Sequence, residues 1–270
     1  MKNTRIAARG LVLLGCGKMG SAMLAGWLDR GLPADRVWVL EPVPSLWLRQ
    51  TGVHINQDLP DAPAVVLVAV KPQVMGDALP SISALGRGET VFVSVAAGTS
   101  LASFEAAFGD TTPIVRAMPN IPAAIGQGIT ALCANAAGQD ALEEAAALLS
   151  AVGDVVVLES ELQMDAVTGV SGSGPAYVFH LIETLAAGGV AQGLPAPLAM
   201  QLARATVAGA GALAMQSDDD PTQLRINVTS PNGTTQAALE VLMDEKAGFP
   251  SLLPRAVAAA TERSRELSRG

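Results

Sequence analysis

The sequence predicts two domains, an α/β domain built on a parallel sheet and then an all-α domain. Over residues 1–161, short apolar runs alternate with stretches that suit helices, as in doubly wound sheets. A glycine-rich turn follows the first of these runs, and small residues or proline follow others. Over residues 162–270 no strand pattern is convincing, and stretches rich in alanine, leucine and glycine predict helices instead.

The composition argues against several classes of protein. The 270 residues include 25 acidic and 17 basic side chains, a net charge of −8, and the basic ones are scattered, whereas nucleic-acid binding favours a basic stripe. Two cysteines, Cys16 and Cys133, are too few for a disulfide framework, and no His/Cys cluster predicts a metal site. No apolar run is long enough for a membrane span, and the N-terminus does not resemble a signal peptide. We expect a cytoplasmic protein that binds neither nucleic acid, metal nor membrane.

The first strand and the turn after it carry the first functional signal. Leu11–Leu14 is a short apolar run, typical of a strand buried on both faces. The next residues, GCGKMG, place Gly15, Gly17 and Gly20 in the G-x-G-x-x-G spacing. In dinucleotide-binding proteins these glycines give a tight turn, a close approach to the pyrophosphate and close helix packing. An ordinary glycine-rich turn is the alternative, but a helix expected over Met19–Arg30 favours a Rossmann-type nucleotide-binding domain.

An acidic residue ends the second predicted strand. This strand covers Val37–Leu40, and Glu41 follows it, 21 residues beyond Gly20. At that place an acidic side chain can accept hydrogen bonds from the adenosine ribose of NAD. A surface acid at the end of a strand is the alternative interpretation.

Further apolar runs complete the predicted sheet. Ala64–Val70 is closed by Lys71 and Pro72, at the carboxyl edge where open α/β sheets bind ligands. Val91–Val95 ends in the small residues of Ala96–Gly98. The other expected elements are a helix capped by Thr99 or Ser100 and ending at Phe108, strands over Ile114–Ala117, Ile129–Cys133 and Val155–Leu158, and a helix over Gln139–Val152.

The chain changes character near residue 161, where the helical half begins. Its 109 residues make a small core by themselves, and their apolar content suggests that they bury it against a second copy of the chain. We therefore expect a homodimer or a larger homo-oligomer. The helices are expected over Tyr177–Gln192, Ala196–Gln216, Thr234–Lys246 and Ser251–Leu267.

Two segments of the helical half, Val170–Tyr177 and Val228–Thr235, are expected to be non-helical. Each combines hydroxyl side chains with glycine, so each can expose backbone N–H groups that form an anion-binding nest at a helix N-terminus. Ordinary turns, with Thr234 or Thr235 capping the next helix, are the alternative.

Few side chains suit strong acid–base catalysis. His54 lies in the nucleotide-binding half and His180 on a helix, and both are expected to be structural. Tyr177 is the only tyrosine, and no Ser-His-Asp arrangement is recognisable. A nicotinamide enzyme without a strong acid suits a substrate that is already electrophilic. A protonated imine is such a substrate, because it accepts a hydride without delivery of a proton to oxygen.

Six segments, in order along nearly the whole chain, carry a family resemblance. They are GCGKMG (15–20), AVKP (69–72), SVAAG (94–98), RAMPN (116–120), DAVTGVSGSGPAYVF (165–179) and VTSPNGTT (228–235). Together they resemble the pyrroline-5-carboxylate reductase family, and the last two are far more specific than the glycine loop. The resemblance implies hydride transfer from NAD(P)H to the cyclic imine carbon of 1-pyrroline-5-carboxylate, giving L-proline in the last step of its synthesis. It also implies a Rossmann-type domain followed by a helical dimerisation domain interleaved with that of a partner.

The resemblance also assigns roles to residues. The N–H groups of Gly233, Thr234 and Thr235 are expected to hold the substrate carboxylate. The Thr235 hydroxyl is expected to face the ring nitrogen as hydrogen-bond partner and proton donor, which makes it the catalytic residue. Ser230 and Ser173, the latter within the turn over residues 171–175, are expected to shape the substrate pocket. The expected coenzyme contacts are Gly15, Cys16, Gly17, Lys18, Met19, Gly20, Glu41, Ala69, Val70, Lys71, Pro72, Ala96, Ala97, Gly98 and, near the nicotinamide, Asn120.

Two positions depart from the family pattern. The family usually has Ser-Pro-Gly-Gly where this chain has Asn232 in the third place, and asparagine tolerates a positive φ better than other non-glycine residues. The family often has small or hydroxyl residues after the second strand, whereas Glu41 predicts that NADH is used at least as well as NADPH. A related imine or acid reductase, and a nucleotide-sensing module without turnover, are the alternatives that the sequence leaves open.

Overall fold

The computed structural model describes residues 5–86 and 88–269, and the chain packs as two compact units. Residues 1–172 and 260–270 form the first unit, and residues 173–259 form the second. The sequence predicts instead that the α/β domain ends at residue 161 and the helical domain covers residues 162–270, and that boundary stays a prediction.

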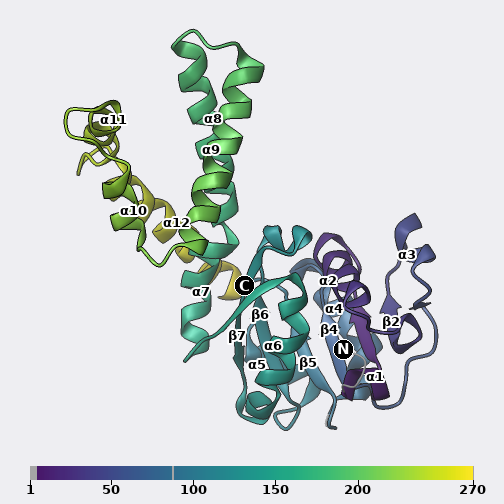
Figure 1. Cartoon of the computed structure of the whole chain (residues 1–270). Helices are drawn as coiled ribbons and strands as arrows, with labels where there is room; N and C mark the ends of the chain where they lie inside the picture. The colour runs from purple at the N-terminus through teal and green to yellow at the C-terminus, as the bar shows by residue number, and fades with distance from the viewer. Residues whose placement is uncertain (1–4, 87, 270) are drawn as a thin grey trace. The chain divides into compact units, whose positions relative to one another are not determined.

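An eight-stranded sheet organises the first unit (Figure 1). Its strands are β1 (Leu11–Leu14), β2 (Val37–Leu40), β3 (His54–Ile55), β4 (Val65–Val68), β5 (Val91–Ser94), β6 (Ile114–Met118), β7 (Gly128–Ala134) and β8 (Gly153–Val157). They lie in the order β3-β2-β1-β4-β5-β6-β7-β8. The sheet therefore grows in opposite directions from β1, and such a switch point is where doubly wound sheets bind ligands.

The expected strands are all present, with two differences from the prediction. β3 was not predicted, because two residues are too few to show a periodic pattern. β6 and β7 are antiparallel, whereas the other neighbouring strands are parallel. Only a short 3₁₀ segment, Ile121–Ile125, joins β6 to β7, and a parallel crossover needs a longer connection.

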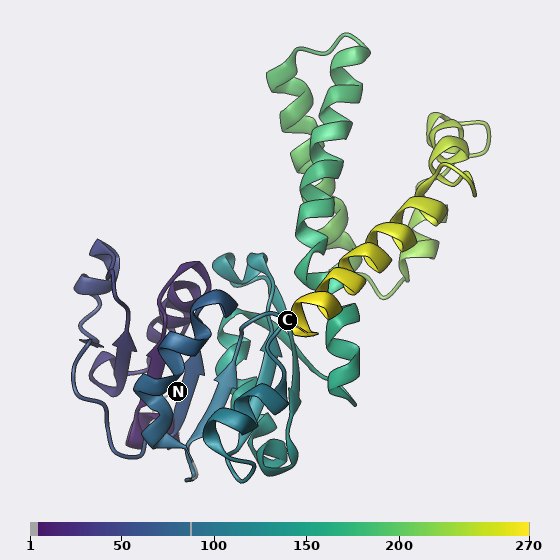
Figure 2. The same ribbon diagram turned by 180° about the vertical axis from the view of Figure 1, so that it is seen from behind.

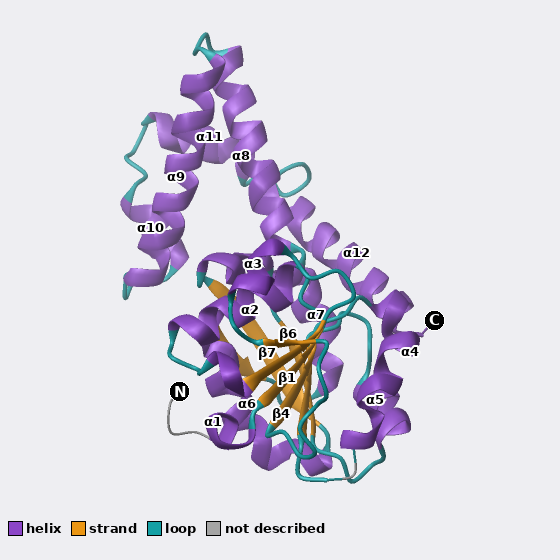
Figure 3. Cartoon of the chain, turned by 90° about the vertical axis from the view of Figure 1, so that its right-hand side faces the viewer, coloured by secondary structure: helices purple, strands orange, loops and turns teal. Residues whose placement is uncertain are grey.

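Helices cover both faces of this sheet, as Figure 3 shows. Successive side chains of β1 enter opposite cores: Leu13 packs in one cluster with Trp27, and Val12 packs in the other with Phe104. Burial on both faces is the physical reason why this strand is a continuous apolar run. The helices of the unit are α1 (Arg5–Arg9), α2 (Lys18–Asp29), α3 (Leu46–Gln50), α4 (Met75–Ala78), α5 (Leu101–Phe108), α6 (Leu142–Leu149) and α7 (Met164–Val167).

Hydrogen bonds from side chains set where α5 begins and where the 3₁₀ turn before α6 begins. The Ser100 hydroxyl accepts the Ser103 N–H at 3.2 Å and so caps α5, as expected. The helix expected over Gln139–Val152 is instead divided, because 3₁₀ turns flank α6 on both sides. The first of these turns starts where the Asn135 side chain accepts the Gly138 N–H at 2.9 Å.

The segment expected to be a loop over residues 170–177 is helical, so that expectation was wrong. α7 continues into a π-helical turn over Thr168–Gly172, and the next helix, α8 (Gly174–Ala191), begins two residues later. Pro175 lies in the first turn of α8, where its missing N–H costs no helical hydrogen bond. Serine and glycine therefore mark a change of helix type here.

The second unit is helical, as predicted. Figure 2 shows α8 beside α9 (Ala196–Gln216) as a hairpin. Among the described residues, the buried cluster of this hairpin consists of three alanines, Ala186, Ala199 and Ala203. One helix of the described chain, α9, is long and apolar enough to cross a membrane by length and composition, with only 11% of its apolar window buried. The remaining helices are α10 (Pro221–Asn227), α11 (Thr234–Leu242) and α12 (Phe249–Arg269), of which α12 ends in the first unit.

Candidate functional site

The glycine loop lies between β1 and α2, at the carboxyl edge of the sheet. Gly15 has a φ of +90°, and a Cβ there would lie 2.8 Å from Val70 Cγ1 and 3.0 Å from the Ala69 carbonyl oxygen. A Cβ on Gly20 would collide with the carbonyl oxygen of Gly15. A Cβ on Gly17 would meet nothing within 4 Å. Packing therefore requires the first and third glycines, and the second leaves open space for a ligand.

The N-terminus of α2 presents backbone N–H groups beside this space. Gly17 is the N-cap and has no side chain to accept hydrogen bonds from the first turn. Gly17 and Lys18 are exposed, and Met19 is half-buried. Because the positive end of the helix dipole also lies here, the loop fits a pyrophosphate. The residues present thus suit the dinucleotide that the sequence predicts.

Glu41 extends its carboxylate back to the glycine loop. Its Oε2 accepts a hydrogen bond of 2.8 Å from the Cys16 N–H, and its Oε1 accepts one of 3.1 Å from the Val43 N–H. The side chain is therefore anchored beside the predicted coenzyme loop. A surface acid at the end of a strand, the alternative interpretation, would not need these contacts. Burial, and then the nearby Glu41 charge, raise the pKa of the Cys16 thiol to about 11.

Two further predicted coenzyme loops follow β4 and β5 at the same edge. The Ala69 N–H donates to the Leu14 carbonyl at 2.8 Å, which joins the first of these loops to the end of β1. In the other loop, Gly98 has a φ of +76°, and a Cβ there would lie 3.5 Å from Leu267 Cβ of α12. Side chains at these positions are small or exposed: Ala69 and Val70 are half-buried, Lys71 and Pro72 exposed, Ala96 buried and Ala97 exposed.

Asn120 follows β6 and is buried. Its Oδ1 accepts a hydrogen bond of 3.0 Å from the Ile129 N–H on β7, which fixes the amide. The Nδ2 group has no hydrogen-bond partner within the described part of the chain. This donor is what Asn120 can offer to a ligand at the edge of the sheet.

A buried ion pair next to this edge was missed by the sequence interpretation. Arg116 of β6 is only 5% exposed, and its Nη1 lies 2.6 Å from Glu161 Oε1. The same oxygen accepts the Leu101 N–H at 2.9 Å, at the start of α5. The only sequence signal was a charged residue inside an apolar strand, and it did not identify the partner. The pair also lies near Cys133, whose pKa rises to about 11, chiefly because of burial.

The predicted substrate turn lies in the second unit, before α11. Asn232 has a φ of +58°, so it adopts the left-handed conformation that the sequence predicts for it. Its N–H donates to Gln236 Oε1 at 2.8 Å. The Gly233 N–H donates to the Ser230 carbonyl at 3.0 Å, so this amide is paired in the structure and the expected set of three free amides is reduced.

The first turn of α11 keeps two backbone donors available. Gly233 is the N-cap of the helix and provides no side-chain acceptor, so the expected alternative of a threonine cap was wrong. The N–H groups of Thr234 and Thr235 have no hydrogen-bond partner among the described residues, nor has the half-buried Thr235 hydroxyl. A Cβ on Gly233 would collide with the Ser230 hydroxyl, so glycine is required for the turn.

The other predicted polar residues have simpler surroundings. Ser173 is half-buried and is the N-cap of α8, where its side chain forms no capping hydrogen bond. His54 contacts Gln57 Oε1 at 3.0 Å, and His180 contacts Glu183 Oε2 at 3.1 Å. Both histidines thus contact nearby residues, and the structural roles expected for them stay predictions.

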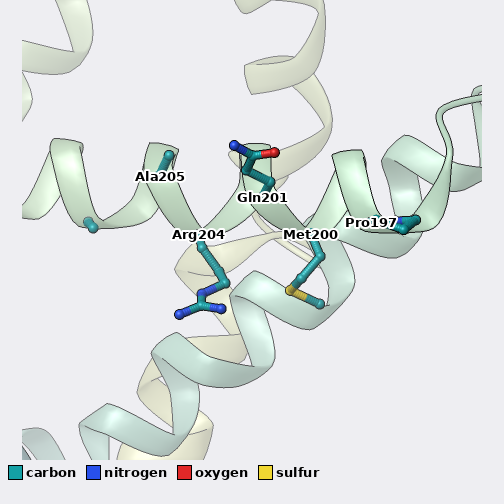
Figure 4. Close-up of a pocket in the computed structure, with 6 residues that line it drawn as sticks. Pro197, Met200, Gln201, Arg204 and Ala205 are labelled. Atoms are coloured by element: carbon teal, nitrogen blue, oxygen red, sulfur yellow. The ribbon is translucent and has the colours of Figure 1, made fainter.

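A shallow hollow on α9 involves none of the predicted residues. Figure 4 shows Met200 and Arg204 on one side of this helix and Gln201 on the other. All the residues that line the hollow belong to α9: Pro197, Met200, Gln201, Arg204, Ala205 and Ala208. A hollow formed along one helix surface belongs to the exposed face of the second unit and lacks the convergent polar groups typical of a ligand site.

Comparison with protein families covers both parts of the chain. Residues 161–267 match the model described as "Pyrroline-5-carboxylate reductase dimerisation". Residues 10–98 match the model described as "NADP oxidoreductase coenzyme F420-dependent". The second match contains the glycine loop, and the first contains the Thr234–Thr235 turn.

Comparison with individual proteins extends over almost the whole length. The chain is 43% identical to a pyrroline-5-carboxylate reductase of Synechocystis sp., covering 96% of this chain and 98% of that protein. It is 38% identical to a pyrroline-5-carboxylate reductase of Pseudomonas aeruginosa, covering 96% of each. A solved pyrroline-5-carboxylate reductase from Coxiella burnetii has a TM-score of 0.88 at 32% identity, covering 96% of this chain and 98% of that one. A pyrroline carboxylate reductase of Plasmodium falciparum with NADP bound has a TM-score of 0.82 at 27% identity, covering 99% of both.

Proposed function

Because this chain belongs to the pyrroline-5-carboxylate reductase family, we propose that it reduces 1-pyrroline-5-carboxylate to L-proline, the last step of proline biosynthesis. The hydride donor is NADH or NADPH. The observation that carries the proposal is the glycine loop, in which packing requires Gly15 and Gly20 while the space above Gly17 stays open. A second set of donors, the free amides that start α11, suits a carboxylate substrate.

The residues of the chain divide the work between binding and orientation. The amides at the start of α2 hold the pyrophosphate, and Asn120 Nδ2 is the donor near the nicotinamide. The N–H groups of Thr234 and Thr235 hold the substrate carboxylate, with Ser230 and Ser173 shaping the pocket. The paired Gly233 N–H joins this set only as a donor shared with the Ser230 carbonyl.

The reaction needs little proton transfer from the protein. The coenzyme, when bound, supplies a hydride. The substrate accepts it as a protonated cyclic imine: the hydride bonds to the imine carbon, and the electron pair of the C=N double bond moves to nitrogen, which becomes the amine of proline. The Thr235 hydroxyl faces this nitrogen as hydrogen-bond partner. When the imine is bound unprotonated, the hydroxyl passes its proton to the nitrogen and takes up a proton from water.

Glu41 determines how well the enzyme uses NADH relative to NADPH. Its carboxylate can accept hydrogen bonds from the ribose hydroxyls of NADH. Facing the 2′-phosphate of NADPH, it is a like charge a few ångströms away, which costs on the order of a few kcal/mol at an effective dielectric near 20, and less in salt. We therefore propose that NADH is used at least as well as NADPH.

The enzyme acts as a homodimer or a larger homo-oligomer. The second unit exposes large apolar side chains along several helices, including Phe179, Leu202, Met215 and Val241. Many exposed large apolar side chains in one unit are typical of a protein–protein contact surface, and the match of residues 161–267 to a dimerisation family agrees with it. The hydropathy of α9 is explained by the same interface. The two free cysteines, of which Cys133 is buried, suit the reducing cytoplasm, where we place the enzyme.

A steady-state assay tests the proposal directly. Purified protein is mixed with 1-pyrroline-5-carboxylate and either NADH or NADPH, and oxidation of the coenzyme is followed by absorbance. Turnover with formation of proline is expected with NADH. Turnover only with a different imine or acid would identify a related reductase, and coenzyme binding without any turnover would identify a nucleotide-sensing module.

A further inference from the structure

Asn56 makes an unusual pair of hydrogen bonds with the backbone of Glu41. Its Oδ1 accepts the Glu41 N–H at 2.9 Å, and its Nδ2 donates to the Glu41 carbonyl at 2.9 Å. One side-chain amide thus satisfies both polar groups of a single residue. No other residue in the described chain holds Glu41 through its backbone in this way.

These two bonds take the place of a strand ladder that stops at this point. The Asn56 N–H donates to the Val39 carbonyl at 2.9 Å, which is the last parallel ladder bond between β2 and β3. If β3 continued, the Glu41 N–H would donate to the Asn56 backbone carbonyl, and the Glu41 carbonyl would accept the N–H two residues further on. Asn56 instead turns into the left-handed region with a φ of +51°, and its side-chain amide substitutes for the missing peptide groups.

Glu41 needs this support because of its place in the chain. It lies one residue past the end of β2, and Pro42, which follows it, has no N–H to continue the sheet. The carboxylate of Glu41 reaches the Cys16 N–H of the glycine loop from this position. A continuous chain of contacts therefore runs from Asn56 through the Glu41 backbone to the loop that is proposed to hold the coenzyme.

We infer that Asn56 is a positioning residue for coenzyme selection: it holds Glu41 so that the carboxylate meets the ribose hydroxyls of NADH and disfavours the 2′-phosphate of NADPH. The inference rests on the proposed function, because it concerns the same coenzyme site. Asn56 acts through Glu41 and is expected to touch neither the substrate nor the reacting atoms. Its effect should therefore appear in coenzyme affinity and not in the rate of hydride transfer.

The test measures dissociation constants for NADH and NADPH by titration calorimetry on the full chain, alongside kcat at saturating NADH. Asn56→Gly removes the amide and still tolerates the left-handed backbone, which separates the side chain from the conformation. We expect NADH binding to weaken about threefold to tenfold, a modest loss because these hydrogen bonds are exposed. NADPH binding should tighten by up to about threefold, because a carboxylate that is no longer held in place opposes the 2′-phosphate less, and kcat should stay at the wild-type value. Gln57→Ala, which removes a neighbouring side chain that contacts His54 and not Glu41, is the matched control.

A double-mutant cycle decides whether Asn56 acts through Glu41. In the Glu41→Ala background, Asn56→Gly should change NADH affinity less than about twofold, because no carboxylate remains to be positioned. Equal losses in both backgrounds, or equal losses for NADH and NADPH, would overturn the inference. If Asn56→Gly does not fold, Asn56→Ser removes the amide donor to the Glu41 carbonyl without adding a charge, and a shift in the same direction is expected. Failure of the wild-type protein to bind either coenzyme would overturn the proposed function itself. If the wild type binds both coenzymes and Asn56→Gly leaves the ratio of NADH affinity to NADPH affinity unchanged, only the inference about Asn56 is overturned.

Discussion

Arg116 and Glu161 form an ion pair of 2.6 Å that ties the sheet to the segment leaving it. Arg116 lies within β6, and Glu161 follows the last strand and also accepts the N–H that starts α5. Three elements therefore meet at one carboxylate oxygen. The arginine is almost fully buried, so removal of Glu161 leaves a buried charge without its partner, whereas removal of Arg116 leaves a carboxylate that is 30% exposed.

Replacement of this arginine should destabilise the first unit. We expect Arg116→Met to lower the free energy of unfolding by about 2 kcal/mol, less than the loss of a fully buried pair because the Glu161 side chain is 30% exposed. Arg263→Met is the matched control, since Arg263 and Glu266 also lie 2.6 Å apart but are both exposed. The control should change stability by less than about 0.5 kcal/mol. Urea unfolding measures both variants, and equal losses would show that burial of Arg116 contributes nothing.

The two cysteines should make the protein less stable at alkaline pH. Burial raises the pKa of both thiols to about 11, from an ordinary value of 9.0. Below pH 9 both thiols are protonated whether the chain is folded or unfolded, and the stability contribution is complete. Between pH 9 and 11 the unfolded chain binds fewer protons than the folded one, so the free energy of unfolding falls as the pH rises.

The variant Cys16→Ala/Cys133→Ala isolates this effect from other alkaline titrations. Thermal unfolding of wild type and variant is compared at a series of pH values from 7 to 11. The wild type should lose more stability than the variant above pH 9, and the two curves should run parallel below it. An identical alkaline decline in both proteins would exclude ionisation of these thiols as its cause.

The parts of the fold that the sequence predicted are those specified by local pattern. Leu11–Leu14 is apolar at every position because both faces are buried, and the glycine spacing after it follows from close packing around Gly15. The start of α9 at Ala196 was also predictable, because Pro195, which comes directly before it, has a restricted φ and is the N-cap of the helix. In each case neighbours along the chain impose the structure.

Features that join distant residues were not predictable in the same way. Arg116 and Glu161 are 45 residues apart, and nothing in either local sequence identifies the other as its partner. The position of Glu41 after β2 was predicted, but its contact with Cys16 depends on the fold of the glycine loop. Asn56 lies at the end of a two-residue strand that shows no periodic pattern. The π-helical turn before α8 was missed because serine and glycine suit several backbone conformations.

The apolar second unit should prevent a stable monomer. Light scattering at micromolar concentration is expected to give at least twice the chain mass of 27.5 kDa. Phe179→Asp, at a side chain 55% exposed on α8, should weaken the association, because a charge is then buried in the interface. Ile125→Asp, at an exposed apolar residue of the first unit, is the control and should leave the mass unchanged. An active wild-type monomer would contradict the proposed assembly.

The Thr235 hydroxyl should affect turnover and leave coenzyme binding intact. Thr235→Ala is expected to lower kcat roughly tenfold to a hundredfold, less than the removal of a strong general acid, because a protonated imine is already activated. Thr235→Ser keeps the hydroxyl and should retain most of the activity. The dissociation constant for NADH, measured by calorimetry, should match the wild type in both variants. Wild-type turnover in Thr235→Ala would remove this hydroxyl from the mechanism.

Replacement of Glu41 should shift coenzyme choice toward NADPH. Glu41→Ser removes the carboxylate that bonds the Cys16 N–H and that opposes a 2′-phosphate. Arg49, the next arginine along the chain, has its Nε directed to the Pro44 carbonyl at 3.3 Å, so it does not already form a phosphate clamp. Loss of a like charge at a few ångströms should improve kcat/KM for NADPH about tenfold, while loss of the ribose acceptor lowers kcat/KM for NADH.

The same comparison separates a local contact from the overall charge of the protein. Asp61→Ser changes the net charge by the same amount at an exposed position and should leave the ratio of the two kcat/KM values unchanged. Raising the salt concentration should lessen the wild-type discrimination against NADPH, because part of it is electrostatic. A wild type that strongly prefers NADPH, with a preference that Glu41→Ser does not alter, would show that the carboxylate stays on the Cys16 and Val43 amides and never meets the ribose. Coenzyme choice would then have to be set by the other residues at the carboxyl edge of the sheet.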